Sequence, residues 1–225
     1  MVKRALVLVI VGIGLVANTA AASEFLHPRL KSKKQVVKSV FIVPARVEIT
    51  RMGIKGAEPM GKESEELGQQ LQALIAGSLK EQGITVNEDA FKAGSAGAND
   101  RTYAIADLQT RYDNLSAQLH KKPKDIQKGR FSMGDDVATA GGGTSADALV
   151  FVRSQGTVLT GGKKAFGLLV GGPSGNGVVS HVTMVDARSG DVLFMSVFTR
   201  GGDFVKNPDK TWTKPLANAF KRIPR

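Results

Sequence analysis

Residues 62–86 read KESEELGQQLQALIAGSLKEQGITV, and this stretch decides the fold class. Its apolar residues recur at the three- and four-residue spacing of one helix face: Leu67, Leu71, Leu74, Ile75 and Leu79. Glutamates stand in its first turns and Lys80 stands near its end, which matches the helix dipole. Gly83 predicts a left-handed stop, and 84–86 reads as a short strand. We therefore expect a helix over 62–82 that leads directly into a strand.

A β-branched run precedes this helix. Residues 36–43 read VVKSVFIV, which favours a buried central strand, and Pro44 is expected to end or bulge its pairing. Val47 and Ile49 then alternate with charged residues, as on a half-exposed extension. Strand, helix, short turn and strand make a βαβ unit, which predicts parallel pairing and a right-handed crossover.

A second helix is expected up to Lys121, with Asn99 or Asp100 as its cap and Pro123 as its stop. Its apolar face holds Ile105, Leu108, Tyr112, Leu115 and Leu119. This spacing suits either a partner-binding stripe or packing on the chain's own sheet, and a single amphipathic helix favours the second. Asp107 and Arg111 have the i,i+4 spacing of an ion pair.

The second half of the chain is expected to be mainly strands. Residues 146–152 read as a third strand that continues towards Leu159. Residues 178–186 and 191–198 form a hairpin around a turn that ends in Gly190. The glycine-rich stretch 161–177 is either a loop or an ordered binding segment. A last helix starts at Asn207–Pro208, and Pro215 is a possible point of restart.

These elements predict a single α/β sandwich with a mixed sheet of about five strands and three or so helices. The sheet is parallel in its first part and antiparallel at the hairpin. The single domain covers 36–225, and residues 23–35 are expected to form a flexible basic segment before it.

The first 22 residues have the pattern of a secretory signal peptide. Lys3 and Arg4 precede an apolar run of about a dozen residues, and the small-residue site ends at Ala22. A membrane span needs about twenty residues, so cleavage between Ala22 and Ser23 is favoured over retention as an anchor. The basic residues of 29–34 are the feature that favours an anchor. The expected location is the periplasm, with or without attachment to a membrane.

The chain contains no cysteine. A lipid-anchored exported protein needs a cysteine at its cleavage point, so this chain is not expected to be a lipoprotein. Disulfides, thiolate metal sites and cysteine nucleophiles are excluded for the same reason. The core must therefore hold the fold without covalent crosslinks.

The net charge of +11 predicts attraction to polyanions, such as the headgroups of an anionic membrane surface. The basic residues are spread along the chain, which is typical of ordinary solvated surface. Only two Tyr and one Trp are present, and none alternates with basic runs as a base-stacking platform requires. We therefore expect no nucleic-acid partner.

Motifs of known chemistry are approached but not completed. Residues 156–164 read GTVLTGGKK, which lacks one glycine position and the final hydroxyl of a phosphate-binding loop. Residues 172–176 read GPSGN, with Asn where a nucleophile elbow needs Gly. Lys163 and Lys164 remain candidates for a flexible basic loop that contacts an anionic partner. No cofactor is expected.

Ionisable residues give no clear catalytic or metal-binding set. His27, His120 and His181 are the three histidines, and no two have metal-ligand spacing. His181 is read as an ordinary strand residue. A catalytic pair would come from these carboxylates: Glu48, Glu88, Asp89, Asp135, Asp136, Asp147, Asp186 and Asp191. Asp147, Asp186 and Asp191 have the positions of normal turn residues, so no catalytic residue is assigned.

Two stretches resemble a known family. Residues 146–150 read ADALV and residues 184–193 read MVDARSGDVL. They resemble a strand and a hairpin of the TolB N-terminal-like superfamily, which includes CsgG-like curli-secretion channel lipoproteins and activators of penicillin-binding proteins. The resemblance spans most of 23–225 and implies a non-enzymatic part of an envelope assembly. The chain departs from the lipoprotein members in lacking the lipidated cysteine.

The function favoured by sequence is therefore a non-catalytic periplasmic interaction or assembly protein of the bacterial cell envelope, possibly associated with secretion or the outer membrane. Its partners would be other envelope proteins or further copies of itself. The alternatives are a hydrolase of an envelope polymer and a polyanion-binding protein. An enzyme predicts a concave cluster of carboxylates or histidines, whereas an assembly protein predicts an exposed apolar patch or an unpaired sheet edge.

Overall fold

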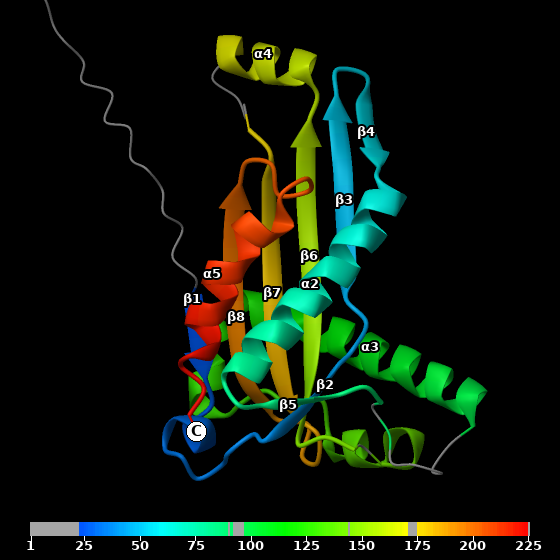
Figure 1. The fold of residues 1–225 in the computed structure, drawn as a ribbon, viewed down its shortest axis with the longest axis vertical. Helices are drawn as coiled ribbons and strands as arrows, with labels where there is room; N and C mark the ends of the chain where they lie inside the picture. The colour runs from blue at the N-terminus through cyan, green and yellow to red at the C-terminus, as the bar shows by residue number, and fades with distance from the viewer. Residues whose placement is uncertain (1–22, 90, 92–96, 144, 171–174, 225) are drawn as a thin grey trace, which may run out of the picture.

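The fold is described from a computed structural model (Figure 1). It covers residues 23–89, 91, 97–143, 145–170 and 175–224. The expected signal peptide, with Ala22, and residues 172–174 of the glycine-rich stretch lie outside the described residues. The description of the sheet therefore begins at Ser23.

One mixed sheet of eight strands forms the centre of the described chain. The strands are β1 (Ser23–Leu26), β2 (Ser39–Ile42), β3 (Arg46–Gly53), β4 (Gly56–Pro59), β5 (Thr85–Asn87), β6 (Ala148–Leu159), β7 (Gly177–Asp186) and β8 (Val192–Gly201). Their order is β1-β8-β7-β6-β2-β5, and β3 continues beside β6 with β4 at its outer edge. The sheet is larger than the five strands expected, because β1 and β4 were not recognised and the run 36–52 forms two strands.

The break in that run lies at Pro44. Ile42 in β2 pairs with Val150 and Arg46 in β3 pairs with Arg153, so one extra residue stands on the β2–β3 side. A proline lacks the amide that a ladder needs, and the chain bulges around it before parallel pairing with β6 resumes. The predicted βαβ pairing is confirmed, since β2 and β5 are parallel across the helix that joins them.

The helices are α1 (Pro28–Lys31), α2 (Gly61–Glu81), α3 (Ala98–Lys121), α4 (Gly161–Val170) and α5 (Pro208–Phe220). Two 3₁₀ helices, η1 (Pro123–Lys128) and η2 (Asp135–Gly142), follow α3. Helices α2 and α5 cover one face of the sheet, and α3 with η1 and η2 covers the lower part of the other face (Figure 1). Each face has its own apolar core, and the apolar stripe of α3 packs on the chain's own sheet.

Three further expectations about the helices are corrected. Gly97 caps α3 in place of Asn99 or Asp100, and the Asp100 side chain accepts a hydrogen bond from the Gly97 amide. Pro215 lies inside α5 and does not restart it. Residues 161–170 form helix α4 at the upper end of β6, where a flexible loop was expected (Figure 1).

The segment 23–35 is part of the folded domain and not a flexible extension. Strand β1 pairs antiparallel with β8, and Leu30 of α1 is fully buried. Arg29 forms an ion pair with Asp191, and the Gln35 side-chain amide donates to the Asp186 carboxylate. Pairing with β8 and burial of Leu30 hold this segment, and neither was visible in its basic composition.

Candidate functional site

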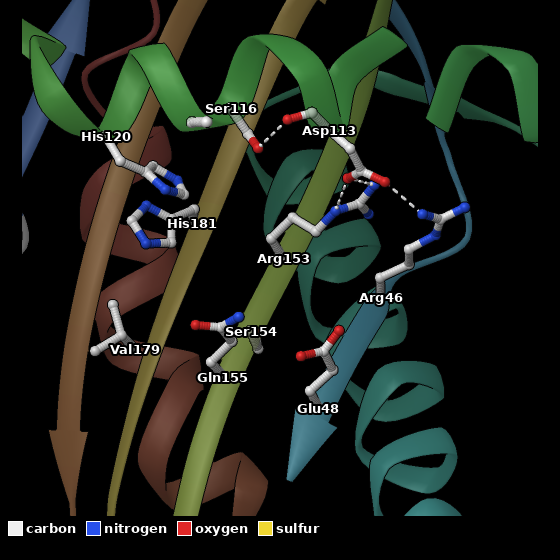
Figure 2. Close-up of a pocket in the computed structure, with 11 residues that line it drawn as sticks. Arg46, Glu48, Asp113, Ser116, His120, Arg153, Ser154, Gln155, Val179 and His181 are labelled. Carbon is white, nitrogen blue, oxygen red and sulfur yellow. Dashed lines mark hydrogen bonds and ion pairs between the residues drawn. The ribbon is translucent and has the colours of Figure 1, made fainter. Parts of the chain in front are cut away.

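A cavity of about 480 Å³ opens where α3 leaves the sheet (Figure 2). Helix α3 supplies one wall, and β3, β6 and β7 supply the floor. The lining residues are Arg46, Glu48, Asp113, Ser116, Ala117, His120, Arg153, Ser154, Gln155, Val179 and His181. The cavity therefore collects charged side chains from four elements that are distant in the sequence.

Asp113 holds the two arginines of the cavity. Its carboxylate accepts a hydrogen bond of 2.6 Å from Nε of Arg153, a second one from the same guanidinium, and an ion pair from Arg46. Arg46 also donates to Oε1 of Gln109 at 3.0 Å. The Arg153 side chain is only 14% exposed, so Asp113 compensates a charge that is largely removed from water. This ion-pair group fixes α3 against β3 and β6.

Tyr112 supports the group from within the core. The Arg153 guanidinium lies 5.2 Å from the centre of the Tyr112 ring, and that ring stacks on Phe151 at 4.4 Å. The Tyr112 hydroxyl and the Thr183 hydroxyl share a hydrogen bond of 2.7 Å. Burial raises the pKa of Tyr112 to about 12, so the phenol stays protonated and serves as a structural contact.

His120 of α3 and His181 of β7 stack at the other end of the cavity, with 3.8 Å between ring centres (Figure 2). Nδ1 of His181 is buried and has no hydrogen-bond partner among the described residues. Desolvation, together with the neighbouring His120, lowers the pKa of His181 to about 4, and desolvation also lowers that of His120. Both rings are neutral near pH 7, and the stack carries no charge repulsion.

This pair predicts a loss of stability in mild acid. A histidine held neutral in the fold binds protons more readily after unfolding, so the free energy of unfolding falls as pH drops from 6.5 towards 4. We expect His181 to account for about 2 kcal/mol of that fall, less than full burial would give because the ring is partly exposed.

The measurement is urea unfolding at several pH values for the parent and for His181→Phe, which keeps an aromatic ring at the stack. The variant should lose less stability than the parent between pH 6.5 and 4.5. Equal slopes in the two proteins would show that His181 does not titrate in this window.

Above the cavity the same face of the sheet stays uncovered in the described part of the chain. Glu48, Gln155, Val179 and Thr199 pair in one row across β3, β6, β7 and β8, and all four are exposed. We call this row the open face. The residues that point to the opposite face, such as Ile49 and Val178, are buried under the helices. A second hollow lies over the open face and shares Glu48, Gln155 and Val179 with the cavity.

The arrangement in the cavity binds more readily than it catalyses. Ser116 Oγ donates to the Asp113 carbonyl oxygen at 2.8 Å, so its hydroxyl is not directed at either histidine. Asp113 is engaged by two arginines, and neutral His181 lacks an orienting partner among the described residues. A nucleophile paired with a base that is itself oriented is the geometry that acyl transfer requires. Among the described residues, no group of three or more His, Asp or Glu side chains has the geometry to hold a metal ion.

The residues proposed from sequence lie apart from this cavity, with the exceptions of Glu48 and two histidines. Lys163 and Lys164 lie in the first turn of α4, so the flexible loop is corrected to a helix. Asp147 accepts hydrogen bonds from the Lys38 and Ser39 amides. Asp186 accepts from the Arg188 and Ser189 amides, as a turn residue does.

Sequence reasoning missed Asp113, Arg153 and the pairing of the histidines. Asp113 is one acidic residue in a helix with several polar ones, and forty positions separate it from Arg153. The available signal was Arg153 itself, a charge that follows the buried apolar run 148–152 within a strand. A charge at such a position needs a partner, but the sequence does not say which one.

Comparisons with known proteins found a distant likeness to solved structures only. No family model matches the chain, and no curated protein matches it in sequence. The PelC dodecamer from Paraburkholderia phytofirmans is similar over 91% of this chain and 99% of that chain, with 12% identity and a TM-score of 0.39. The lipoprotein GNA1162 from Neisseria meningitidis (73% and 82% covered, 14% identity, TM-score 0.29) is also similar. So is the C-terminal domain of LpoB from Salmonella enterica (78% and 95% covered, 13% identity, TM-score 0.28).

Values this low leave the function of the chain to be argued from its own residues. The resemblance to the TolB N-terminal-like superfamily stays a prediction, since no family model matches. Among the described helices none is long and apolar enough to cross a membrane.

Proposed function

We propose that the protein is a non-catalytic interaction protein of the bacterial cell envelope, exported to the periplasm, that contacts other envelope proteins through its open face. The proposal rests on one observation: four strands present an exposed row on one side, while their other side is packed under α2 and α5. The signal-peptide pattern of 1–22 supports the location.

The composition of the open face suits recognition between proteins. It combines an acid, an amide, a valine and a hydroxyl, and the ion-pair group of Asp113 borders it. Protein interfaces are on average about as apolar as the rest of the surface, so such a mixture is compatible with binding. The rigid sheet beneath keeps these side chains in place without a further ordering cost.

Site-specific photocrosslinking in intact cells tests the proposal. A photoreactive residue at Gln155 or Thr199 should give one discrete crosslinked species, with a partner that mass spectrometry identifies. Gln69 is the control because it is an exposed glutamine on the solvent side of α2. Gln155→Arg should remove the species obtained from position 199. The proposal fails if positions 155 and 199 give no discrete species, or if position 69 gives the same one.

A hydrolase of an envelope polymer is the alternative that the cavity favours. Glu48 and the histidine pair border one concavity, as an enzyme would require. That reading predicts turnover of cell-wall material that Glu48→Gln abolishes. Hydrolysis by the parent protein, lost in the variant, would replace the interaction proposal.

A further inference from the structure

The upper end of the molecule carries exposed apolar side chains beside lysines. Helix α4 lies crosswise over the ends of the long strands, level with the turn between β3 and β4 (Figure 1). Leu168 and Leu169 of α4 are 73% and 85% exposed, and Ile54 of the turn is 76% exposed. We call α4 and the β3–β4 turn together the tip. Three large aliphatic side chains are thus held in water at one extremity of the fold.

The two parts of the tip are joined to each other. The Thr160 amide, just before α4, donates to the Met52 carbonyl at 3.1 Å, next to the turn. A methyl group added at Gly162 would lie 3.0 Å from Cδ1 of Ile54, so the first turn of α4 lies against the β3–β4 turn. Ile54 and the helix therefore form one surface.

The charge of the tip has a single sign. Lys55 follows Ile54 in the turn, and Lys163 and Lys164 stand in the first turn of α4. Between Asp147 and Asp186 the chain contains no acidic residue, and 49–57 contains none either. Lysines next to exposed aliphatic side chains are the composition of an interfacial helix, which buries its apolar face among lipid headgroups.

We propose that the tip docks on an anionic phospholipid surface, with Ile54, Leu168 and Leu169 inserted at the level of the headgroups. Lys55, Lys163 and Lys164 then contact lipid phosphates, which anionic membranes attract to basic segments. The crosswise direction of α4 matches a membrane plane perpendicular to the long strands (Figure 1). The open face is left free for a protein partner, so this inference is independent of the proposed function.

The size of the apolar surface favours lipid over a second protein. Each partner of a stable protein complex contributes about 800 Å² to the interface, which three aliphatic side chains do not supply. Insertion into a bilayer needs only a few apolar side chains together with charge attraction. A second copy of this chain would also bring the three lysines of its own tip against those of the first.

Vesicle binding by the protein recovered after export tests the inference. The probes are vesicles of phosphatidylglycerol mixed with phosphatidylcholine, and vesicles of phosphatidylcholine alone. The parent should partition to the first and not the second, and binding should weaken as salt rises. Leu168→Ser/Leu169→Ser and Lys163→Glu/Lys164→Glu should each lower the partition coefficient by at least about tenfold.

A matched control separates the tip from the general positive charge of the chain. Lys31→Glu/Lys34→Glu changes the charge by the same amount at the exposed, opposite end of the molecule. It should lower binding by less than about threefold, because those residues lie beyond the Debye length from a membrane at the tip. Every variant shares the N-terminus of the parent, so any contribution from that end cancels in the comparison.

The absence of cysteine allows a direct measure of insertion. Leu169→Cys provides one attachment point for a polarity-sensitive dye, whose emission should shift to the blue on phosphatidylglycerol vesicles. The same dye on Gln69→Cys should not shift. The inference is overturned by absence of binding, by equal loss in both lysine variants, by an unchanged dye at position 169, or by a dimer that Leu168→Ser/Leu169→Ser dissociates.

Discussion

Gly190→Ala is expected to lower the free energy of unfolding by about 3 kcal/mol, the largest loss we predict for a single added methyl group. Gly190 ends the turn between β7 and β8 with a φ of +71°, a conformation that alanine adopts only with strain. A Cβ at this position would also lie 2.2 Å from the carbonyl oxygen of Gly134. That atom belongs to backbone, which has no rotamer to escape to.

The segment before η2 makes this contact rigid. The Met133 amide donates to the Gly190 carbonyl at 2.9 Å, and the Val192 amide donates to the Phe131 carbonyl at 3.0 Å. The hairpin and residues 131–134 are thus held together by hydrogen bonds on both sides of Gly190. Relief of the clash requires breaking some of them.

Gly83→Ala is the control for conformational strain alone. Gly83 has a φ of +77°, and no atom lies within 4 Å of the position its Cβ would take. Its replacement should cost about 1 kcal/mol. Urea unfolding of the two variants measures the difference. Equal losses would mean that the Gly134 carbonyl moves aside freely and that the close packing of the turn is not significant.

Asp113→Ala is expected to lower the free energy of unfolding by about 2 kcal/mol, and to loosen the cavity wall between α3 and the sheet. The variant leaves Arg153 without its carboxylate partner, although this side chain is only 14% exposed. Arg46 loses the same partner, but it is more exposed and regains water. The loss therefore comes mainly from Arg153.

Asp107→Ala is the matched control on the same helix. Asp107 pairs with Arg111 at 2.7 Å in an exposed i,i+4 position, and Arg111 keeps Asp136 as a second partner. Its removal should cost less than about 0.5 kcal/mol. A double variant Asp113→Leu/Arg153→Met removes both buried charges, and it should recover part of the stability lost in Asp113→Ala.

Chemical unfolding of the four proteins forms the test. If Asp113→Ala costs no more than Asp107→Ala, then Arg153 finds water or another acceptor, and the ion pair does not hold α3 in place. If the double variant is less stable than Asp113→Ala, the packing of the two side chains outweighs their charge.

The elements with strong local signals were predicted correctly. The stripe of Leu67, Leu71 and Ile75 with Gly83 behind it gives α2 within a residue at each end. The turn that ends in Gly190 gives the β7–β8 hairpin, and 148–159 gives β6. Periodicity and turn chemistry act over a few residues, so they are readable along the chain.

The elements missed from sequence depend on distant partners. β1 is a strand because β8 offers its edge, and β4 because β3 turns back on itself. Helix α4 was obscured by the glycines at 161, 162 and 167, which lower helix propensity. In each case a contact outside the segment decides its structure.

By itself the sequence determined the α/β class, the parallel βαβ unit, the hairpin, the exclusion of cysteine chemistry and the expectation of export. Only the tertiary structure decided where the charges meet. Arg46, Asp113 and Arg153 come from three elements and share one cavity, and His120 meets His181 across the same space. The tip likewise joins Ile54 to Leu168 and Leu169. Secondary structure follows from local backbone and side-chain preferences, whereas a site needs the register of strands and the packing of helices, which only the folded chain provides.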